Sequence, residues 1–318
     1  MNVYGPVPSR RLGRSLGINN IPSKVCPYSC VYCQVGRTTH LQAARSAFLS
    51  PEVLVAEVAE RVEKLRGRGE NVDYLSFVPN GEPTLDVNLG RTIELLKPLG
   101  IRIAVITNAS LLWRAEVRED LSKADWVSVK VDTVREDLWR KLNRPHPSLR
   151  LTELLDGIRA FAEVFQGELE TETMLVRGVN DSGNDLKRTG TFIARLDPAR
   201  ACLSAPVRPP AELWVEPPTE DMLNTAFQIY RECGLPVEML VEFEGTYFSS
   251  TGDIGEDLLA ITAVHPMRED AVREFLARRN GDWHTVRELI EEGHLVETEY
   301  GGSRFFVRKY QQKRLNRF

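Results

Sequence analysis

The stretch Lys24–Thr38, KVCPYSCVYCQVGRT, contains three of the five cysteines of the chain, Cys26, Cys30 and Cys33, in the spacing Cys-x3-Cys-x2-Cys. Cysteine thiolates are the usual ligands of iron–sulfur clusters, and three of them on one short loop can hold three irons of a [4Fe–4S] cluster. No fourth cysteine follows nearby in the sequence. One iron would therefore keep an open coordination position, which is typical of a catalytic rather than a closed structural metal site.

A structural zinc ion is the alternative occupant of this loop, with His40 completing a Cys3His set. Zinc ribbons usually contain two separated Cys-x2-Cys pairs, however, and the sequence has no second pair. The other cysteines, Cys202 and Cys233, fall singly in a predicted strand and a predicted helix, where a cysteine usually acts as a small buried hydrophobic residue. The spacing therefore favours a cluster over zinc.

The composition is that of an ordinary globular protein, with 318 residues of which 42% are hydrophobic and 27% charged. The N-terminus lacks the apolar segment of a secretion signal, and no run of about 18 apolar residues predicts a membrane span. An odd number of cysteines in a chain of this length argues against a disulfide scaffold. We therefore expect a reducing, cytoplasmic environment and no membrane partner.

Charge is distributed unevenly along the chain, although the net charge is only −4. Residues 1–49 and 304–318 each contain six Lys or Arg residues and no Asp or Glu. Of the 41 basic and 45 acidic residues, 29 basic and all 45 acidic ones therefore fall between these ends. Basic ends can attract an anionic partner such as nucleic acid, although a basic tail can also be simply solvated.

Strand-like and helix-like segments alternate along most of the chain. Ser50 and Pro51 suit the N-cap and first turn of a helix, for example, and Leu54 and Val58 follow at helical spacing. Six to seven such units predict an α/β fold, a partial (βα)6-type barrel of parallel strands, over residues 1–250. The predicted strands span residues 15–19, 72–78, 101–107, 125–132, 170–179, 200–207 and 236–243.

The pattern changes after about residue 250. Two short amphipathic segments, 267–281 and 283–293, precede two strand-like runs joined by Gly301 and Gly302. A two-glycine connection between such runs is typical of a hairpin. Residues 251–318 are therefore predicted to form a small C-terminal winged-helix-like domain with a basic tail.

Three further segments follow the cysteine motif along the chain, and together with it they carry a resemblance to a known family. CPYSCVYC (26–33) resembles the Cys-x3-Cys-x-aromatic-Cys signature of the radical S-adenosylmethionine (radical SAM) superfamily. VPNGEPTL (78–85) looks like the Gly-Gly-Glu segment of that family, with Asn80 in place of the first glycine. ITNAS (106–110) and VSVKVD (127–132) are similar to its third-strand and fourth-strand motifs.

This resemblance implies a chemistry and a set of cofactor contacts. The open iron would chelate the methionine end of S-adenosylmethionine, and an electron from a reductant such as flavodoxin or ferredoxin would release a 5′-deoxyadenosyl radical that abstracts a substrate hydrogen. Family motifs imply contacts to the adenine near Tyr32 and Gln34 and to the ammonium group from Gly81 and Glu82. Candidates for the ribose or carboxylate contacts are Asn108, Lys130, Asp132 and Arg177.

Some of these side chains also have structural interpretations. Asn108 and Lys130 could be solvated strand ends, but amide and charged groups in an apolar strand are otherwise costly to bury. Arg177 could bind a carboxylate in bidentate fashion or form an ordinary salt bridge. Glu172 is a weaker candidate, because it could alternate outward along its strand.

Within the superfamily, the chain is similar to the branch of Fe–S oxidoreductases related to the tRNA wyosine synthases. The segments YGPVPSRRLGRSLGINNIPSK (4–24), CQVGRTT (33–39) and RGVND (177–181) carry this likeness. It implies that the basic residues of the N-terminal segment lie near the cysteine loop and face substrate phosphates, with tRNA as the partner; these residues are Arg10, Arg11, Arg14, Lys24 and Arg37. Unlike those synthases, the chain has no cysteine before Cys26 that could bind a second cluster.

Two other functions remain open from the sequence. Winged-helix modules can bind peptides, and the NGEP segment also resembles enzymes that place a glycyl radical on a partner protein, so peptide or protein modification is one alternative. The other is a DNA-binding regulator that uses its cluster as a sensor. Its recognition helix, near 283–293, carries Glu288, Glu291 and Glu292, which suit a polyanion poorly.

Overall fold

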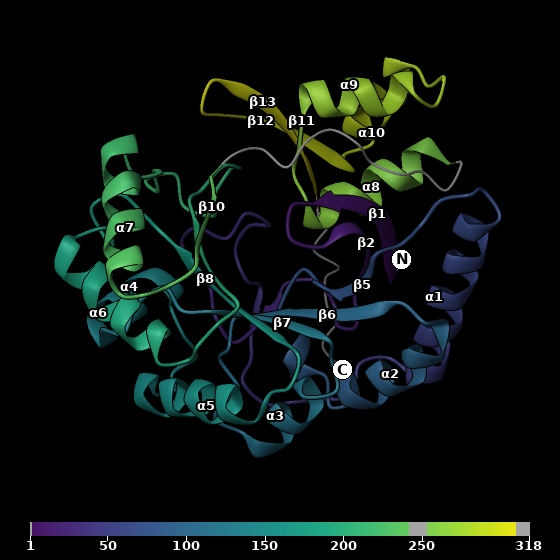
Figure 1. Ribbon diagram of the computed structural model, residues 1–318. Helices are drawn as coiled ribbons and strands as arrows, with labels where there is room; N and C mark the ends of the chain where they lie inside the picture. Colours follow the sequence, from purple (N-terminus) through teal and green to yellow (C-terminus); the bar gives the residue numbers. More distant parts are fainter. Residues whose placement is uncertain (1, 242–252, 310–318) are drawn as a thin grey trace, which may run out of the picture.

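The computed structural model describes residues 2–241 and 253–309, and at its centre an eight-stranded sheet curves into an open barrel (Figure 1). Neighbouring strands from β2 to β10 are parallel, whereas β1 is antiparallel to β2. The predicted α/β fold with a partial parallel barrel is therefore confirmed. In sheet order the strands are β1 (Val3–Ser9), β2 (Gly13–Ile18), β5 (Tyr74–Phe77), β6 (Arg102–Thr107), β7 (Trp126–Lys130), β8 (Glu168–Met174), β9 (Arg200–Ser204) and β10 (Val237–Leu240).

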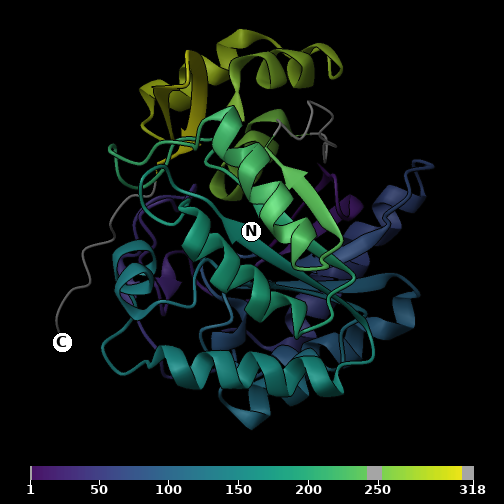
Figure 2. The ribbon, with the colours of Figure 1, turned by 60° about the vertical axis from the view of Figure 1, so that its left-hand side comes forward.

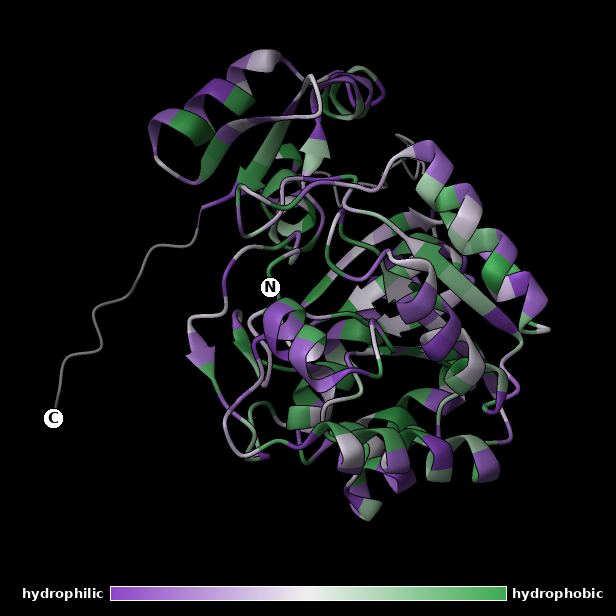
Figure 3. Cartoon of the chain, turned by 90° about the vertical axis from the view of Figure 1, so that its left-hand side faces the viewer, coloured by the Kyte–Doolittle hydropathy of each residue, from purple (hydrophilic) through white to green (hydrophobic). Residues whose placement is uncertain are grey.

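Helices cover the outer face of the sheet (Figures 1 and 2), and α6 and α7 pack against each other. In α1, Pro51 occupies the first turn and the predicted stripe of Leu54, Val58, Val62 and Leu65 is buried. Hydrophilic and hydrophobic residues alternate along the helices (Figure 3), as expected where one side packs on a sheet. The helices are α1 (Pro51–Arg66), α2 (Leu89–Leu96), α3 (Ala115–Leu121), α4 (Glu136–Asn143), α5 (Leu151–Val164), α6 (Gly183–Ala194) and α7 (Glu220–Glu232), with 3-10 turns at Pro83–Leu85 and Lys97–Leu99.

The two faces of each strand have different roles. On β7, Val127 and Val129 belong to the main hydrophobic core, whereas Ser128 contacts a side chain within the barrel. Successive residues of a strand point to opposite faces, so every second position lines the barrel interior. The carboxyl ends of the parallel strands meet at one rim, where the loops with the predicted site residues begin.

The first strand differs from the prediction. Residues 15–19 were expected to start the sheet, but β1 precedes them and forms a hairpin with β2. The tip of this hairpin closes the amino-terminal end of the barrel, because Leu12 packs there against Tyr74, Ala104 and Trp126. The sequence pattern missed β1 because Pro6 and Pro8 interrupt its apolar run.

The chain after residue 252 forms a separate hydrophobic cluster around three helices and a small antiparallel sheet. The expected hairpin is present, with Gly301 and Gly302 at positive φ values of 55° and 71°. The winged-helix assignment and the boundary at 250 stay predictions, and most of the basic tail lies outside the described residues. The elements are α8 (Ile254–Val264), β11 (Met267–Arg268), α9 (Glu269–Ala277), α10 (Trp283–Glu291), β12 (Leu295–Tyr300) and β13 (Ser303–Arg308).

This C-terminal part lies above the gap between the two edge strands, β1 and β10 (Figure 1). Helix α8 packs on β1, and the Nδ2 atom of Asn80 donates a hydrogen bond to the Ala263 carbonyl at 3.0 Å. On the other side, the Tyr300 hydroxyl donates to the Pro206 carbonyl at 3.0 Å. The open side of the barrel is therefore bridged by the C-terminal part. None of the helices in the described ranges is long and apolar enough to span a membrane.

Candidate active site

The cysteine loop follows β2 and is held against the loop that follows β5. The Lys24 amide donates to the Asn80 carbonyl at 2.6 Å, and the Glu82 amide donates to the Val25 carbonyl at 3.2 Å. Between these bonds, Val25 and Gly81 form a parallel bridge. A Cβ atom on Gly81 would lie closer than 3.0 Å to the Val25 carbonyl oxygen, so the close approach of the two backbones requires glycine.

Amide donors face two of the three cysteine sulfurs. The Asn108 Nδ2 atom lies 3.2 Å from the Cys26 Sγ atom, and the Tyr28 amide lies 3.5 Å from it. The Asn143 Nδ2 atom lies 3.5 Å from the Cys30 Sγ atom. Hydrogen bonds to cysteine sulfur are among the groups that set the reduction potential of an iron–sulfur cluster. Burial raises the pKa of the Cys30 thiol to about 12, so a thiolate at this position needs a nearby cation, which iron would supply.

The donor set fits a multi-iron cluster better than a single zinc ion. In the described part of the chain, no three His, Cys, Asp or Glu side chains converge on one metal position. A zinc ion needs its thiolates within about 2.3 Å of one point. A [4Fe–4S] cluster instead binds each thiolate to a different iron, so its ligands stand further apart. His40, the proposed fourth zinc ligand, is exposed on the short strand β4 (His40–Leu41), which pairs with β3 (Val25–Cys26).

Glu82 lies buried beneath the cysteine loop, with both carboxylate oxygens bonded to the protein. Its Oε1 atom accepts hydrogen bonds from the Thr84 and Thr107 hydroxyls, each at 2.6 Å. Its Oε2 atom accepts from the Asn108 amide at 2.8 Å. Burial raises the pKa of Glu82, and these donors counteract that rise. The carboxylate therefore holds in place the loop that presents Asn108 to Cys26.

Lys130, at the carboxyl end of β7, lies 5.0 Å from the ring centroid of Tyr32 and 3.0 Å from the Glu172 carboxylate. Burial alone would lower the pKa of Lys130, but the carboxylates of Glu172 and Asp132 raise it. Burial would conversely raise the pKa of Glu172, but the cations of Lys130 and Arg11 hold it down at about 2. Both members of the Lys130–Glu172 pair are therefore charged at neutral pH.

Asp132 joins the cysteine loop to α4. Its Oδ2 atom accepts hydrogen bonds from the Tyr32 hydroxyl and, at 2.8 Å, from the Asn143 Nδ2 atom. Its Oδ1 atom accepts from the Met174 amide at 2.9 Å. Asn143 thus contacts Asp132, Tyr32 and Cys30 together, yet the sequence analysis did not single it out. The only sequence signal was an amphipathic segment after β7, which was not interpreted as a helix.

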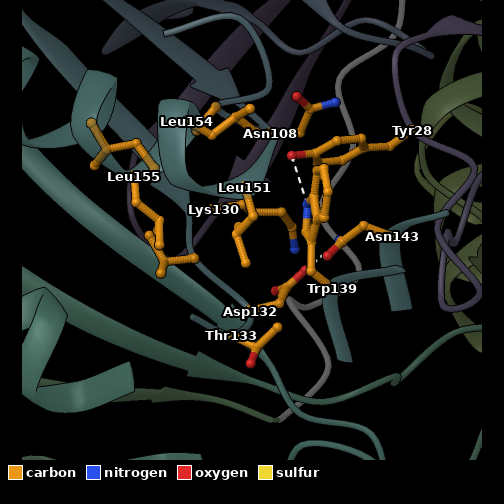
Figure 4. A pocket seen from close by; sticks show the side chains of 13 residues that line it. Tyr28, Asn108, Lys130, Asp132, Thr133, Trp139, Asn143, Leu151, Leu154 and Leu155 are labelled. Carbon is orange, nitrogen blue, oxygen red and sulfur yellow. Dashed lines mark hydrogen bonds between the residues drawn. The ribbon is translucent and has the colours of Figure 1, made fainter. Parts of the chain in front are cut away.

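A small pocket beside the cysteine loop collects several of these groups (Figure 4). Lys130 and Asp132 enter it from the end of β7, and Asn108 from the loop after β6. The Trp139 indole, on α4, donates to the Tyr28 hydroxyl at 3.0 Å and closes one side. Leucine side chains of α5 form the apolar side. The structure thus brings Asn108, Lys130 and Asp132 together in one pocket, and their contacts to the cofactor stay a prediction.

Other predicted residues lie elsewhere. Gln34, which directly follows Cys33, accepts a hydrogen bond from Arg208 at 3.2 Å and does not line the pocket of Figure 4. Arg177 is half-exposed and pairs with Glu216 at 2.7 Å. Of the three N-terminal arginines, Arg10 is exposed and Arg14 pairs with Glu70, both at the amino-terminal end of the barrel, and Arg11 points inward.

Arg11 contacts β7 and β8 from the hairpin tip. It donates to the Ser128 hydroxyl and to the Glu172 carboxylate, each at 2.9 Å, and lies 5.4 Å from the Trp126 ring centroid. Its side chain is 11% exposed, so it is poorly placed to bind phosphate in solution. For Arg10, Arg11 and Arg14, the prediction that they face an RNA near the cysteines therefore lacks geometric support.

We expect Arg11→Ala to lower the free energy of unfolding by about 3 kcal/mol, because it leaves Glu172 and Glu170 buried with fewer cations. Arg10→Ala, at the exposed neighbouring position, should change it by less than about 0.5 kcal/mol. Urea unfolding of both variants measures the difference. Equal stabilities of the two variants would show that the inward ion pairs of Arg11 carry no net stabilisation.

Comparisons with known proteins agree with this site. The family model described as Radical SAM superfamily matches residues 20–189. The UPF0026 protein MJ1312 of Methanocaldococcus jannaschii is 43% identical over 315 residues, which are 98% of this chain and 98% of that protein. The UPF0026 protein slr1464 of Synechocystis is 38% identical over 209 residues, covering 65% of this chain and 76% of that protein.

A solved structure of TYW1 with a lysine-pyruvate adduct bound superposes with a TM-score of 0.53 at 17% identity, covering 69% of this chain and 73% of that one. At this identity the likeness concerns the fold alone. The family match spans the cysteine loop, the NGEP segment and the ends of β6, β7 and β8. The chain therefore belongs to the radical SAM superfamily and is an enzyme that uses a [4Fe–4S] cluster and S-adenosylmethionine.

Proposed function

We propose that Cys26, Cys30 and Cys33 ligate the cluster and that S-adenosylmethionine binds between this loop and the end of β7. When bound, the cluster supplies the electron that cleaves S-adenosylmethionine to methionine and a 5′-deoxyadenosyl radical, which abstracts a hydrogen atom from the substrate. The observation that carries this proposal is the convergence of Asn108 and Asn143 on two cysteine sulfurs beside a polar pocket.

The protein residues have separate tasks in this proposal. Asn108 and Asn143 donate to sulfur and stabilise thiolate charge. Glu82 positions Asn108, because its carboxylate accepts a hydrogen bond from the Asn108 backbone amide. Lys130 presents an ammonium group at the pocket, where it suits the carboxylate of the methionine end or the ribose hydroxyls. Gly81 leaves room for the backbone to approach the cysteine loop.

For the substrate we favour tRNA, because cations gather on the outer side of the cysteine loop. Arg37 and Arg144 both pair with Glu212, at 3.0 Å and 2.5 Å, so two guanidinium groups share one carboxylate. Arg208 contacts Gln34 in the same region. A positive rim beside a reactive site is a common feature of proteins that bind nucleic acid phosphates. Arg37 belongs to the basic N-terminal residues that the sequence analysis expected to face phosphates, whereas Arg144 and Arg208 were not singled out there.

Peptide or protein modification, including glycyl-radical activation, stays the alternative substrate class. The sensor hypothesis loses its support, because the superfamily to which the chain belongs consists of enzymes. A cytoplasmic location would suit the tRNA hypothesis and would keep the cysteines reduced.

The first test is to reconstitute the protein anaerobically and supply S-adenosylmethionine with dithionite, which should release 5′-deoxyadenosine. Binding of tRNA should weaken with salt, and Arg37→Glu should reduce the salt slope by about one or more. Arg91→Glu on α2 is the matched control, because the exposures of Arg91 and Arg37 are similar, 65% and 69%. Release of 5′-deoxyadenosine without any tRNA binding at low salt would favour the peptide alternative. Mass spectrometry of tRNA from a deletion strain then identifies the product.

A further inference from the structure

A second concave surface lies beside the cysteine loop, apart from the pocket of Figure 4. This groove is lined by residues 40–44, Ser46, Trp113, Arg114, His146 and Ser148. It is wider and more open than the pocket that collects Lys130 and Asp132. Its lining comes from three loops that follow β4, β6 and α4, and none of its residues contributes to the proposed cofactor site.

A residue that lines the groove, Gln42, is hydrogen-bonded to the backbone of the first cysteine. The Gln42 amide donates to the carbonyl of Cys26 at 3.1 Å. The His146 amide donates to the carbonyl of Pro27 at 2.8 Å, and Tyr28 forms a backbone bridge with Pro145. A molecule seated in the groove would thus connect to a cluster ligand through two short bonded paths. The rate of electron transfer falls steeply with distance, so the groove is a favourable place for an electron to enter.

The exposed side chains of the groove have the composition of an interface. Leu41 and Trp113 are 41% and 39% exposed, and both line this one groove. The Arg114 guanidinium stacks 4.5 Å from the Trp113 ring centroid. Trp and Arg are the residues most enriched at the energetic centres of protein interfaces. A surface of this kind favours a folded protein over an RNA, which would require several phosphate contacts.

The charge of the groove indicates the charge of its partner. Among the described residues that line it, none is acidic. Arg114 pairs with Glu116 outside the lining, whereas Arg118 and Arg150 donate to the backbone carbonyls of Trp113 and Pro147, at 3.0 Å and 2.9 Å. These rim cations would attract an acidic protein and increase its association rate.

We propose that this groove is the docking surface for an acidic one-electron carrier protein that reduces the cluster through Cys26. The carrier loses one electron and the cluster gains it, and no atom or proton is transferred. The inference rests on the proposed cluster, and radical SAM enzymes generally need a reductant. Leu41 and Trp113 provide the apolar contact, and Arg114 with the rim arginines provides the charge complementarity.

The test compares two reductants on the reconstituted holoenzyme in anaerobic stopped-flow experiments. Reduced flavodoxin is the protein probe, and dithionite is the small reductant that needs no docking site. The Trp113→Ala and Arg114→Glu variants should each lower the second-order rate of cluster bleaching by flavodoxin at least about tenfold. The rate with dithionite should change less than about twofold. Trp214→Ala is the matched control, because Trp214 is similarly exposed, at 46%, but lies outside the groove.

Iron content, measured before the kinetics, separates the possible failures. If the wild-type protein holds no cluster, the proposed function fails and the docking test does not begin. If iron is present and flavodoxin reduces both groove variants at the wild-type rate, the docking proposal is overturned. A fall of equal size with dithionite would also overturn it, since the substitutions would then act on the cluster itself. Added tRNA could slow the flavodoxin reaction of the wild type while leaving the rates of the groove variants unchanged. That result would assign the groove to RNA instead.

Discussion

Replacing Cys30 by alanine is expected to lower bound iron from about four atoms per chain to near none, and to abolish release of 5′-deoxyadenosine. The loop offers three thiolates in all, one for each of three irons. The two thiolates that remain in the variant cannot bind three irons. The Asn143 amide, which lies 3.5 Å from the Cys30 sulfur, loses its acceptor as well. Iron analysis and absorbance near 400 nm after anaerobic reconstitution measure the first effect, and product chromatography measures the second.

Cys233→Ala is the matched control for this prediction. Cys233 caps the end of α7, and its sulfur lies 4.0 Å from the Thr191 hydroxyl, outside the cysteine loop. Its replacement should leave iron content and product release unchanged. The assignment of the three ligands would be wrong if Cys30→Ala retained about four irons, or if Cys233→Ala lost them. One stoichiometric zinc per wild-type chain would contradict the cluster itself.

The barrel could be predicted from the sequence because its signals are local. Buried strands such as β6 carry nearly continuous apolar runs, and α1 carries an N-terminal proline and a regular stripe. Once the strands are parallel, their carboxyl ends share a rim. The cysteine loop, the NGEP segment and the end of β7 therefore had to lie near one another. Asn108 and Lys130 were named as candidates because ITNAS and VSVKVD resemble family motifs, and the shared rim explains why the two residues lie near one another.

The directions of individual side chains could not be predicted in the same way. Arg11 points inward because the hairpin of β1 and β2 folds under the barrel, and that hairpin was not expected. Glu82 was expected to face the cofactor, but it is surrounded by donors from Thr84, Thr107 and Asn108. Two of these donors lie about 25 residues away, so their convergence is a tertiary feature. A charged residue beside a motif can equally be a structural support.

Asn143 is a residue of the site that the sequence analysis did not single out. It was missed because its helix, α4, is short and ends in a left-handed residue, Arg144, with φ of 44°. That turn directs the chain back towards the cysteine loop, where the Ser29 amide bonds to the Asn143 carbonyl at 3.0 Å. Nothing in the local sequence indicates that an amide at the end of α4 will face a cysteine. The contact follows from the packing of α4 over the rim of the barrel.

Gly81→Ala is expected to reduce iron incorporation at least about tenfold, comparable to loss of an outer contact at a metal site. The new Cβ would meet the Val25 carbonyl oxygen closer than 3.0 Å, and Val25 directly precedes Cys26. Backbone on both sides of the contact is fixed by the Lys24–Asn80 and Glu82–Val25 hydrogen bonds, so neither side can move freely. The clash must then displace the cysteine loop from the Asn108 amide. Iron content after reconstitution and the affinity for S-adenosylmethionine measure the result.

Gly183→Ala provides the control, because Gly183 begins α6 and a Cβ there meets only the Ile229 side chain at 3.7 Å. It should leave iron binding intact and change stability by less than about 1 kcal/mol, in the stabilising direction. Urea unfolding of the apo proteins separates a local effect from a global one. If Gly81→Ala binds iron normally, the two loops can separate without cost, and the bridge between them does not position the cluster. If it loses iron while its unfolding midpoint stays near that of the wild type, the glycine acts by placing Cys26. The second result is expected, since the contact lies at the rim and leaves the helix-covered face of the sheet untouched.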